Sequence, residues 1–307
     1  MAHPHHEHAG RHEISSLNRA FIIGITLNAL FVLFEFIAGF ATRSVGLMSD
    51  AGHNLSDVVS LILAMLAFRL SEINANSKYT YGYKKSTILI SLLNAILLLI
   101  AVGVIAAESI GKIISPQPVE GGVIAWVAAT GVLINAFTAW LFMKNREKDL
   151  NVKGAYLHMA ADALVSAGVM VSGIVIAYTG WLIPDPVIGL TVAAVIVHAT
   201  WQLLRDSVRL SLDGVPAGIS IDDIEAAMRA VDGIRDIHHT HIWALSTTET
   251  ALTAHIVVDD AGRMETVKRS LKLILRKKAI THATLEFETD GAECTDTCNG
   301  ADRKSGR

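Results

Sequence analysis

The stretch SDAGHNLSDVV, residues 49–59, lies inside one of the most apolar parts of the chain, between SVGLM and SLILAMLAF. It places Asp50, His53, Asn54 and Asp57 within about two turns of a helix. Burying an ionisable group in membrane hydrocarbon costs at least about 2.5–3.5 kcal/mol, so such residues usually have a function. The function of the chain therefore depends on what these side chains do in an apolar segment.

The composition is that of a membrane protein. Of the 307 residues, 51% are hydrophobic, and the mean hydropathy of +0.43 is too high for an ordinary soluble domain. The net charge is -3, and in the apolar part of the chain Lys and Arg occur in short groups beside the apolar runs. This pattern excludes a basic face for nucleic acid, and we expect no nucleic-acid partner.

Six apolar runs are each long enough to cross a hydrocarbon core of about 30 Å as a helix of about 20 residues. Lys and Arg gather between the second and third runs and between the fourth and fifth, which predicts that both termini face the cytoplasm. The length and the short loops favour a multi-pass protein of a bacterial inner membrane. The runs cover residues 17–40, 46–69, 86–113, 122–144, 153–178 and 184–207.

After Leu210 the sequence predicts a small domain of the α+β class. A helix around ISIDDIEAAMRAVDGI, two alternating strands, a basic amphipathic helix METVKRSLKLILRKKA and a third strand HATLEFET follow one another. We therefore expect an α-β-β-α-β domain on the cytoplasmic side. The predicted parts are a His-rich cytoplasmic tail (1–16), a six-helix transmembrane domain (17–208), the cytoplasmic α+β domain (209–290) and a cytoplasmic tail (291–307).

Two His-x-x-x-Asp pairs stand in predicted membrane helices. Residues i and i+4 share a helix face, so His53 pairs with Asp57, and His158 pairs with Asp162 in LHMAADAL. Two imidazole nitrogens and two carboxylate oxygens that converge in a dry bundle describe a tetrahedral Zn²⁺ site. Hard ions such as Mg²⁺ or Ca²⁺ prefer shells with more oxygen ligands.

The alternative is that these polar groups only hydrogen-bond across helices and lock the bundle. A single His-x-x-x-Asp pair would fit a metal site and interhelical hydrogen bonding about equally well. Two pairs in two of the six runs favour the metal site. Glu35, in the first run, could line a hydrated path or form an interhelical hydrogen bond. His255 and Asp259 have the same spacing but stand in a predicted strand, where four residues span about 13 Å, so this spacing cannot hold one ion there.

These features resemble the cation diffusion facilitator family, in its zinc-transporting branch of the bacterial cobalt–zinc–cadmium efflux type. The resemblance rests on SDAGHNLSD, HMAADAL, the six runs and HTHIWAL…TAHIVV…HATLEFE, and it covers roughly residues 17–290. It implies a homodimeric metal/proton antiporter with a ferredoxin-like cytoplasmic domain. Its transport ligands correspond to His53, Asp57, His158 and Asp162.

The resemblance also implies a second metal site, a structural or regulatory Zn²⁺ in the cytoplasmic domain. Its ligands would be His239, His255, His282 and Glu288, although Glu288 fits the spacing from His282 only with a small gap. By strand alternation, His239 and His241 would share a face opposite His238.

The two tails are rich in metal-binding residues. Cys294 and Cys298 form C-x₃-C, which could join a cytoplasmic zinc site or could be two inert thiols; two cysteines form no disulfide framework. The N-terminal segment could collect zinc weakly or be a solvated segment without fixed structure. It contains His3, His5, His6, His8 and His12.

The sequence thus predicts a proton-coupled exporter of Zn²⁺, with Cd²⁺ and Co²⁺ as further candidate substrates. Zn²⁺, H⁺, membrane lipid and a second copy of the chain are the expected partners, and no enzymatic activity is expected. The alternatives are a membrane-embedded metal sensor without flux and a metal-dependent membrane hydrolase. The hydrolase would need a general base beside an open coordination position, and no Glu follows His53 or His158 as in H-E-x-x-H.

Overall fold

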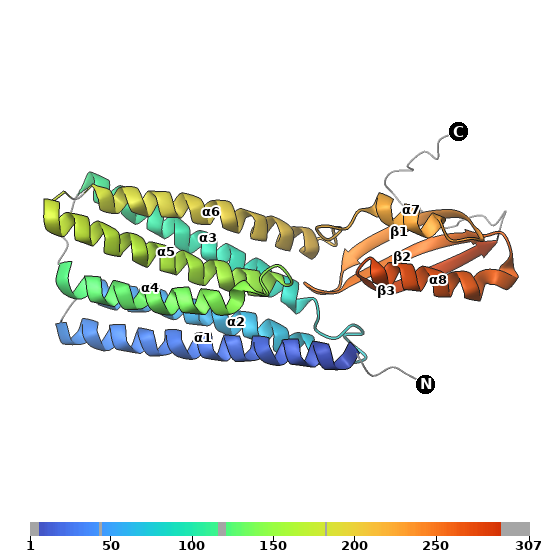
Figure 1. Ribbon diagram of the computed structural model, residues 1–307, viewed down its shortest axis with the longest axis horizontal. Coiled ribbons are helices and arrows are strands. Elements are labelled where there is room, and N and C mark those ends of the chain that lie inside the picture. Colours follow the sequence, from blue (N-terminus) through green and yellow to red (C-terminus); the bar gives the residue numbers. More distant parts are fainter. Residues whose placement is uncertain (1–5, 43–44, 116–120, 182, 290–307) are drawn as a thin grey trace. The chain divides into compact units, whose positions relative to one another are not determined.

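The computed structural model describes residues 6–42, 45–115, 121–181 and 183–289. The chain divides into two compact units, Met1–Val208 and Arg209–Arg307. The first unit is helical, and the second combines helices with a sheet (Figure 1).

The first unit contains long helices that lie alongside one another (Figure 1). Among the described residues, four helices contain spans that are long and apolar enough to cross a membrane: Leu17–Ala38, Ser86–Ile114, Leu150–Ile176 and Pro186–Ser211. The expectation of apolar membrane helices is therefore confirmed for four of the six predicted runs. The helices are α1 (His6–Thr42), α2 (Val45–Ser71), α3 (Ser86–Ile114), α4 (Gly121–Met143), α5 (Leu150–Thr179) and α6 (Pro184–Ser211).

Local sequence fixes both ends of α5. The Asp149 carboxylate accepts hydrogen bonds from the backbone N–H groups of Asn151 and Val152, which otherwise lack partners in the first helical turn. At the other end Gly180 adopts φ 66°, the left-handed conformation that glycine tolerates best. The same helix is tied to the start of α3, because the Asn151 amide donates to the Thr87 carbonyl oxygen at 3.0 Å.

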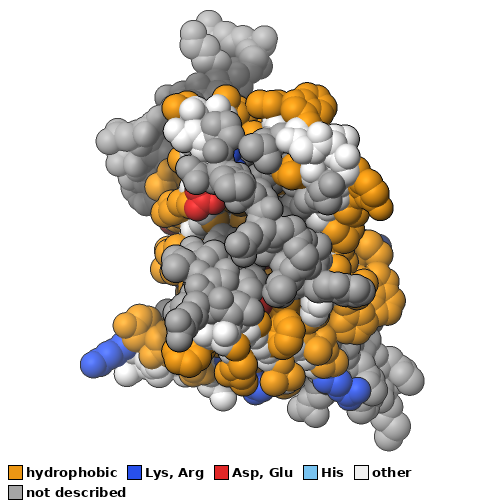
Figure 2. Space-filling model, turned by 90° about the vertical axis from the view of Figure 1, so that its left-hand side faces the viewer, with side chains coloured by type: hydrophobic (Ala, Val, Ile, Leu, Met, Phe, Trp, Pro, Cys, Tyr) orange, Lys and Arg blue, Asp and Glu red, His pale blue; other side chains and the backbone are white. Residues whose placement is uncertain are grey.

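Aromatic and small residues pack the helices together. The Phe21 ring lies 4.7 Å from that of Phe142 and 5.6 Å from that of Phe68, which joins α1 to α4 and α2. A side chain at Gly24 would come within 2.9 Å of Thr138, so glycine allows α1 and α4 to approach closely. Large apolar side chains such as Leu33 and Phe36 point outward, and hydrophobic side chains cover much of the described surface in Figure 2. An apolar exterior of this kind suits lipid.

The second unit packs two helices on one face of a three-stranded sheet, in the predicted order α-β-β-α-β. Its sheet order is β1-β2-β3, with β1 and β2 antiparallel and β2 and β3 parallel. Ile224 and Met228 of α7 and Leu271 of α8 are buried with Leu252 and the other inward-facing strand residues. The elements are α7 (Ile221–Arg229), β1 (Ile234–Ala244), β2 (Thr250–Val258), a 3₁₀ turn (Ala261–Arg263), α8 (Met264–Lys277) and β3 (Ile280–Thr289).

A β-bulge interrupts β1 between His238 and His241. His238 pairs with His255 and His241 with Thr253, so three steps along β1 match two steps along β2. His239 within the bulge has φ 50°, a left-handed conformation in which a bulged residue is often found. Because residues 253 and 255 share a face of β2, His238 and His241 also share a face of the sheet. The expectation from simple alternation, His239 and His241 together opposite His238, is therefore wrong.

Candidate metal centre

Asp57, His158 and Asp162 meet inside the first unit. Asp57 lies on α2, the other two lie one turn apart on α5, and all three are buried, with exposed fractions of 2%, 6% and 9%. One ligand atom from each lies within 4.8 Å of the others. The helical spacing that singles out these residues in the sequence thus brings three of the four predicted transport ligands together.

Two of the separations in this cluster bracket the spacing of ligand atoms around a tetrahedral Zn²⁺. His158 Nε2 lies 2.6 Å from Asp57 Oδ1 and 3.9 Å from Asp162 Oδ2. Zn²⁺ binds N and O ligands at about 2.0–2.2 Å, which keeps neighbouring ligand atoms of a tetrahedron about 3.3 Å apart. The two separations lie on either side of this value, so small side-chain rotations can form the site.

His53, the fourth predicted ligand, stands on α2 one turn before Asp57. Its side chain lies outside the described residues, as does that of Asp50. The helix nevertheless places the His53 position on the face of Asp57, because residues four apart share a side of the helix.

A second polar contact lies beside this cluster. The Asn54 amide donates to Glu35 Oε2 at 2.6 Å and links α2 to α1, and Glu35 is fully buried. The sequence singles out both residues but does not pair them. Asn54 is three positions before Asp57, so this contact holds the part of α2 that carries the candidate ligands.

The second unit contains another His and carboxylate cluster, formed by His238, His255 and Glu288. Glu288 Oε1 lies 2.7 Å from His255 Nδ1, and Glu288 Oε2 lies 3.5 Å from His238 Nε2. His255 and Glu288 belong to the predicted cytoplasmic set. His238 does not, and the bulge in β1 places it there.

The other two predicted residues of that set lie elsewhere. The His239 ring is 5.0 Å from the His255 ring, but the cluster of ligand atoms does not include His239. His282 pairs with Ala251, near the start of β3, whereas Glu288 pairs with Val257 near its end. Six residues of strand span about 20 Å, so His282 and Glu288 cannot bind one ion together.

A sequence signal for the bulge was available. Ile237 and Ile242 are both buried in the core although they are five residues apart. In an unbroken strand, residues five apart point to opposite faces, so this pair of apolar residues indicates an inserted residue between them.

An ion pair stands at the start of β1, beside the cluster. Arg229 Nη1 contacts Asp236 Oδ1, and Asp236 Oδ2 lies 3.7 Å from His238 Nδ1. Burial alone would raise the pKa of Asp236, but the hydrogen bond from Arg229 and the charges of Arg229 and His238 hold that pKa below its ordinary value. Asp236 thus stays ionised at the edge of the cluster, where it contacts both Arg229 and His238.

The predicted metal-binding tails cannot be placed. Cys294 and Cys298 lie outside the described residues, as do His3 and His5. α1 begins at His6, but the side chains of His6, His8 and His12 also lie outside the described part of the structure.

Comparison with known proteins covers both units. Residues 21–210 match the family described as "Cation efflux transmembrane domain", and residues 216–289 match "Cation efflux protein, cytoplasmic domain". The chain is 33% identical over 295 residues to the "Cadmium, cobalt and zinc/H(+)-K(+) antiporter" of Bacillus subtilis, covering 94% of this chain and 93% of that protein.

Two further relatives are similar over nearly their whole length. The "Metal cation efflux system protein CzcD" of Cupriavidus metallidurans is 34% identical, with 95% of this chain and 91% of the relative covered. The "Zinc transporter ZitB" of Escherichia coli is 32% identical, with 94% and 93% covered. The two family matches, residues 21–210 and 216–289, span the positions of both clusters.

Proposed function

The chain belongs to the cation efflux family, and from this premise we propose that it exports Zn²⁺ from the cytoplasm in exchange for protons. Cd²⁺ and Co²⁺ are further candidate substrates, because relatives carry these metals in their names. The observation that carries the proposal is the buried convergence of Asp57, His158 and Asp162 between α2 and α5. His53 completes this set as the fourth ligand.

The same contacts suggest how metal and proton exchange. A separation of 2.6 Å between His158 Nε2 and Asp57 Oδ1 is a hydrogen bond, so a proton lies between these atoms. Zn²⁺ can bind only to neutral imidazole and ionised carboxylate, so it must displace that proton. Reprotonation of the pair from the other side of the membrane would then expel the metal.

Proton coupling also offsets the electrical work. Moving Zn²⁺ outward against an inside-negative potential costs about 4.6 kcal/mol per 100 mV, and one inward proton returns about half of that. A pH gradient adds to the driving force. Alternating access would require α2 and α5 to open the cluster to each side in turn.

The proposal includes the arrangement in the membrane. All six helices α1–α6 cross the bacterial inner membrane with both termini in the cytoplasm, as the Lys and Arg distribution favours. The second unit is a ferredoxin-like domain through which two copies form a dimer, in keeping with its match to a cytoplasmic domain of cation efflux proteins. Its cluster of His238, His255 and Glu288 would bind a structural or regulatory Zn²⁺.

The test is zinc-driven proton flux in proteoliposomes, with the native protein, Asp57→Ala and His158→Ala. We expect flux in the native protein and a loss of at least about 100-fold in both variants, because each leaves the site one ligand short. His198→Ala is the matched control, since His198 is an exposed histidine of α6 in the same unit. Zinc binding without flux in the native protein would exclude transport and leave a metal sensor.

A further inference from the structure

Helix α8 carries two groups of basic residues in different surroundings. In its first half, Glu265 pairs with Lys268 at 3.0 Å and with Arg269 at 3.3 Å. In its second half stand Lys272 and Arg276. Across residues 6–42, 45–115, 121–181 and 183–289, no carboxylate lies within ion-pair distance of either side chain.

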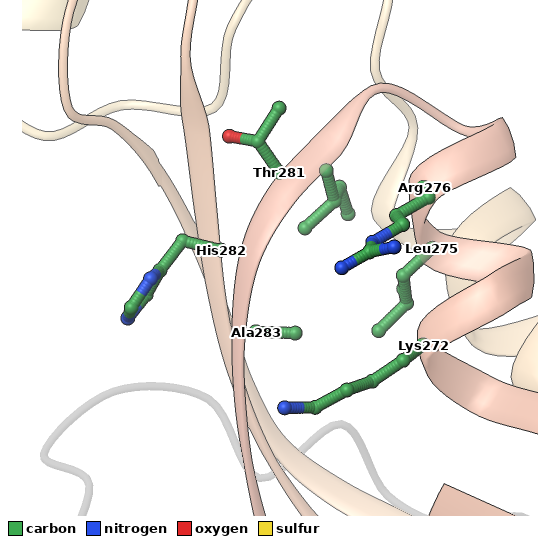
Figure 3. A pocket seen from close by; sticks show the side chains of 7 residues that line it. Lys272, Leu275, Arg276, Thr281, His282 and Ala283 are labelled. Atoms are coloured by element: carbon green, nitrogen blue, oxygen red, sulfur yellow. The ribbon is translucent and has the colours of Figure 1, made fainter. Parts of the chain in front are cut away.

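Lys272 and Arg276 border a small pocket between α8 and β3. Its volume is about 120 Å³, and Leu275, Ile280, Thr281, His282 and Ala283 complete its lining. Figure 3 shows the Lys272 and Arg276 side chains extending from α8 toward β3, with the His282 ring on the other side of the strand. Two cationic side chains thus line a pocket whose floor includes the buried Leu275 and Ile280.

Lys272 and Arg276 are both solvent-exposed, and their placement favours a negative partner. Like charges four residues apart on a helix repel one another. The helix dipole favours cations in the last turn, which includes Arg276, but it does not extend to Lys272. An anion held between both side chains would offset the repulsion.

The size and geometry of the pocket indicate which anion. Drug-sized ligands need pockets of about 300–1,000 Å³, so this one fits only a compact group. A phosphate group carries nearly two negative charges at neutral pH, and it accepts the planar fork of an Arg together with a Lys ammonium. The Thr281 hydroxyl already donates to the Thr250 carbonyl oxygen at 3.1 Å, so binding rests on the two cations.

We propose that the pocket between α8 and β3 binds a phosphate group through Lys272 and Arg276. The group is either free inorganic phosphate or the headgroup of an anionic lipid. The site is separate from both His and carboxylate clusters and does not depend on metal transport.

The test is calorimetric titration of the full-length protein in zwitterionic nanodiscs with sodium phosphate, at constant ionic strength and with a chelator to remove zinc. We expect saturable binding that weakens at least about tenfold in the double variant Lys272→Gln, Arg276→Gln, because it loses both charge-assisted contacts. The matched control is Lys268→Gln, Arg269→Gln on the same helix. It removes the same charge and should change the dissociation constant less than about twofold.

A second arm separates the two sources. Repeating the titration in nanodiscs with an anionic phospholipid weakens phosphate binding if the headgroup occupies the pocket, and leaves it unchanged if free phosphate is the ligand. Acetate, measured on the native protein, provides a check that needs no variant and should bind at least about tenfold more weakly than phosphate. The absence of saturable phosphate binding, equal loss in both double variants, or acetate as tight as phosphate would each overturn the proposal.

Discussion

The buried cluster of the helical unit and the sheet cluster of the second unit use the same residue types in different settings. The side chains of Asp57, His158 and Asp162 are 3%, 8% and 10% exposed, whereas those of His255 and Glu288 are each 12% exposed and that of His238 is 29% exposed. The first cluster depends on two regular helices, and the second depends on an irregularity in a strand. Metal binding and release inside a dry bundle change the protonation of buried groups, whereas a metal on a partly exposed sheet face can exchange with the surrounding water.

The largest expected effect separates the transport site from the structural or regulatory site of the second unit. Asp162→Asn should lower zinc flux in proteoliposomes at least about 100-fold, because a buried ligand loses its charge. Glu288→Gln makes the same chemical change in the sheet cluster and should lower flux less than about threefold, because ions do not pass through it. Equal losses in the two variants would mean that the sheet cluster lies on the transport path.

A smaller effect distinguishes the ligands of the sheet cluster. His238→Ala should weaken the zinc affinity of the second unit at least about tenfold, because it removes one of three ligands. His282→Ala removes a histidine of the same sheet outside the cluster and should leave the affinity unchanged. Zinc titration of the full-length protein carrying Asp57→Ala, which disables the buried site, measures both. A loss only in His282→Ala would favour the ligand set implied by the family resemblance.

The smallest expected effect concerns the bulge. At His239, whose φ is 50°, glycine should preserve or raise the free energy of unfolding by up to about 1 kcal/mol, because it adopts this conformation without strain. His239→Val should lower it by about 1–2 kcal/mol, since a β-branched residue is an outlier there. Thermal unfolding of the full-length protein shows which of the two variants is more stable. A His239→Val variant more stable than His239→Gly would contradict the assigned conformation.

Much of the buried site could be predicted because the helix period is regular. Asp57 on α2, and His158 and Asp162 on α5, follow from i, i+4 spacing in apolar runs, and the structure brings them within 4.8 Å. The hydrogen bond between Asn54 and Glu35 could not be predicted, since nothing in a sequence states how far one helix is rotated against another. The sheet cluster was predicted only in part. One inserted residue in β1 moves every position after it to the opposite face from the one that simple alternation predicts.

The amino-acid sequence alone was enough to predict the apolar helices, the α-β-β-α-β order of the second unit and the spacing of the His-x-x-x-Asp pairs. These features depend on composition and on periods of a few residues, which local sequence records. The fold was needed to show that His238 and not His239 joins His255 and Glu288, and that Lys272 and Arg276 line a pocket beside β3. Such arrangements depend on strand register and on how elements pack, and packing forces act between residues far apart in the chain.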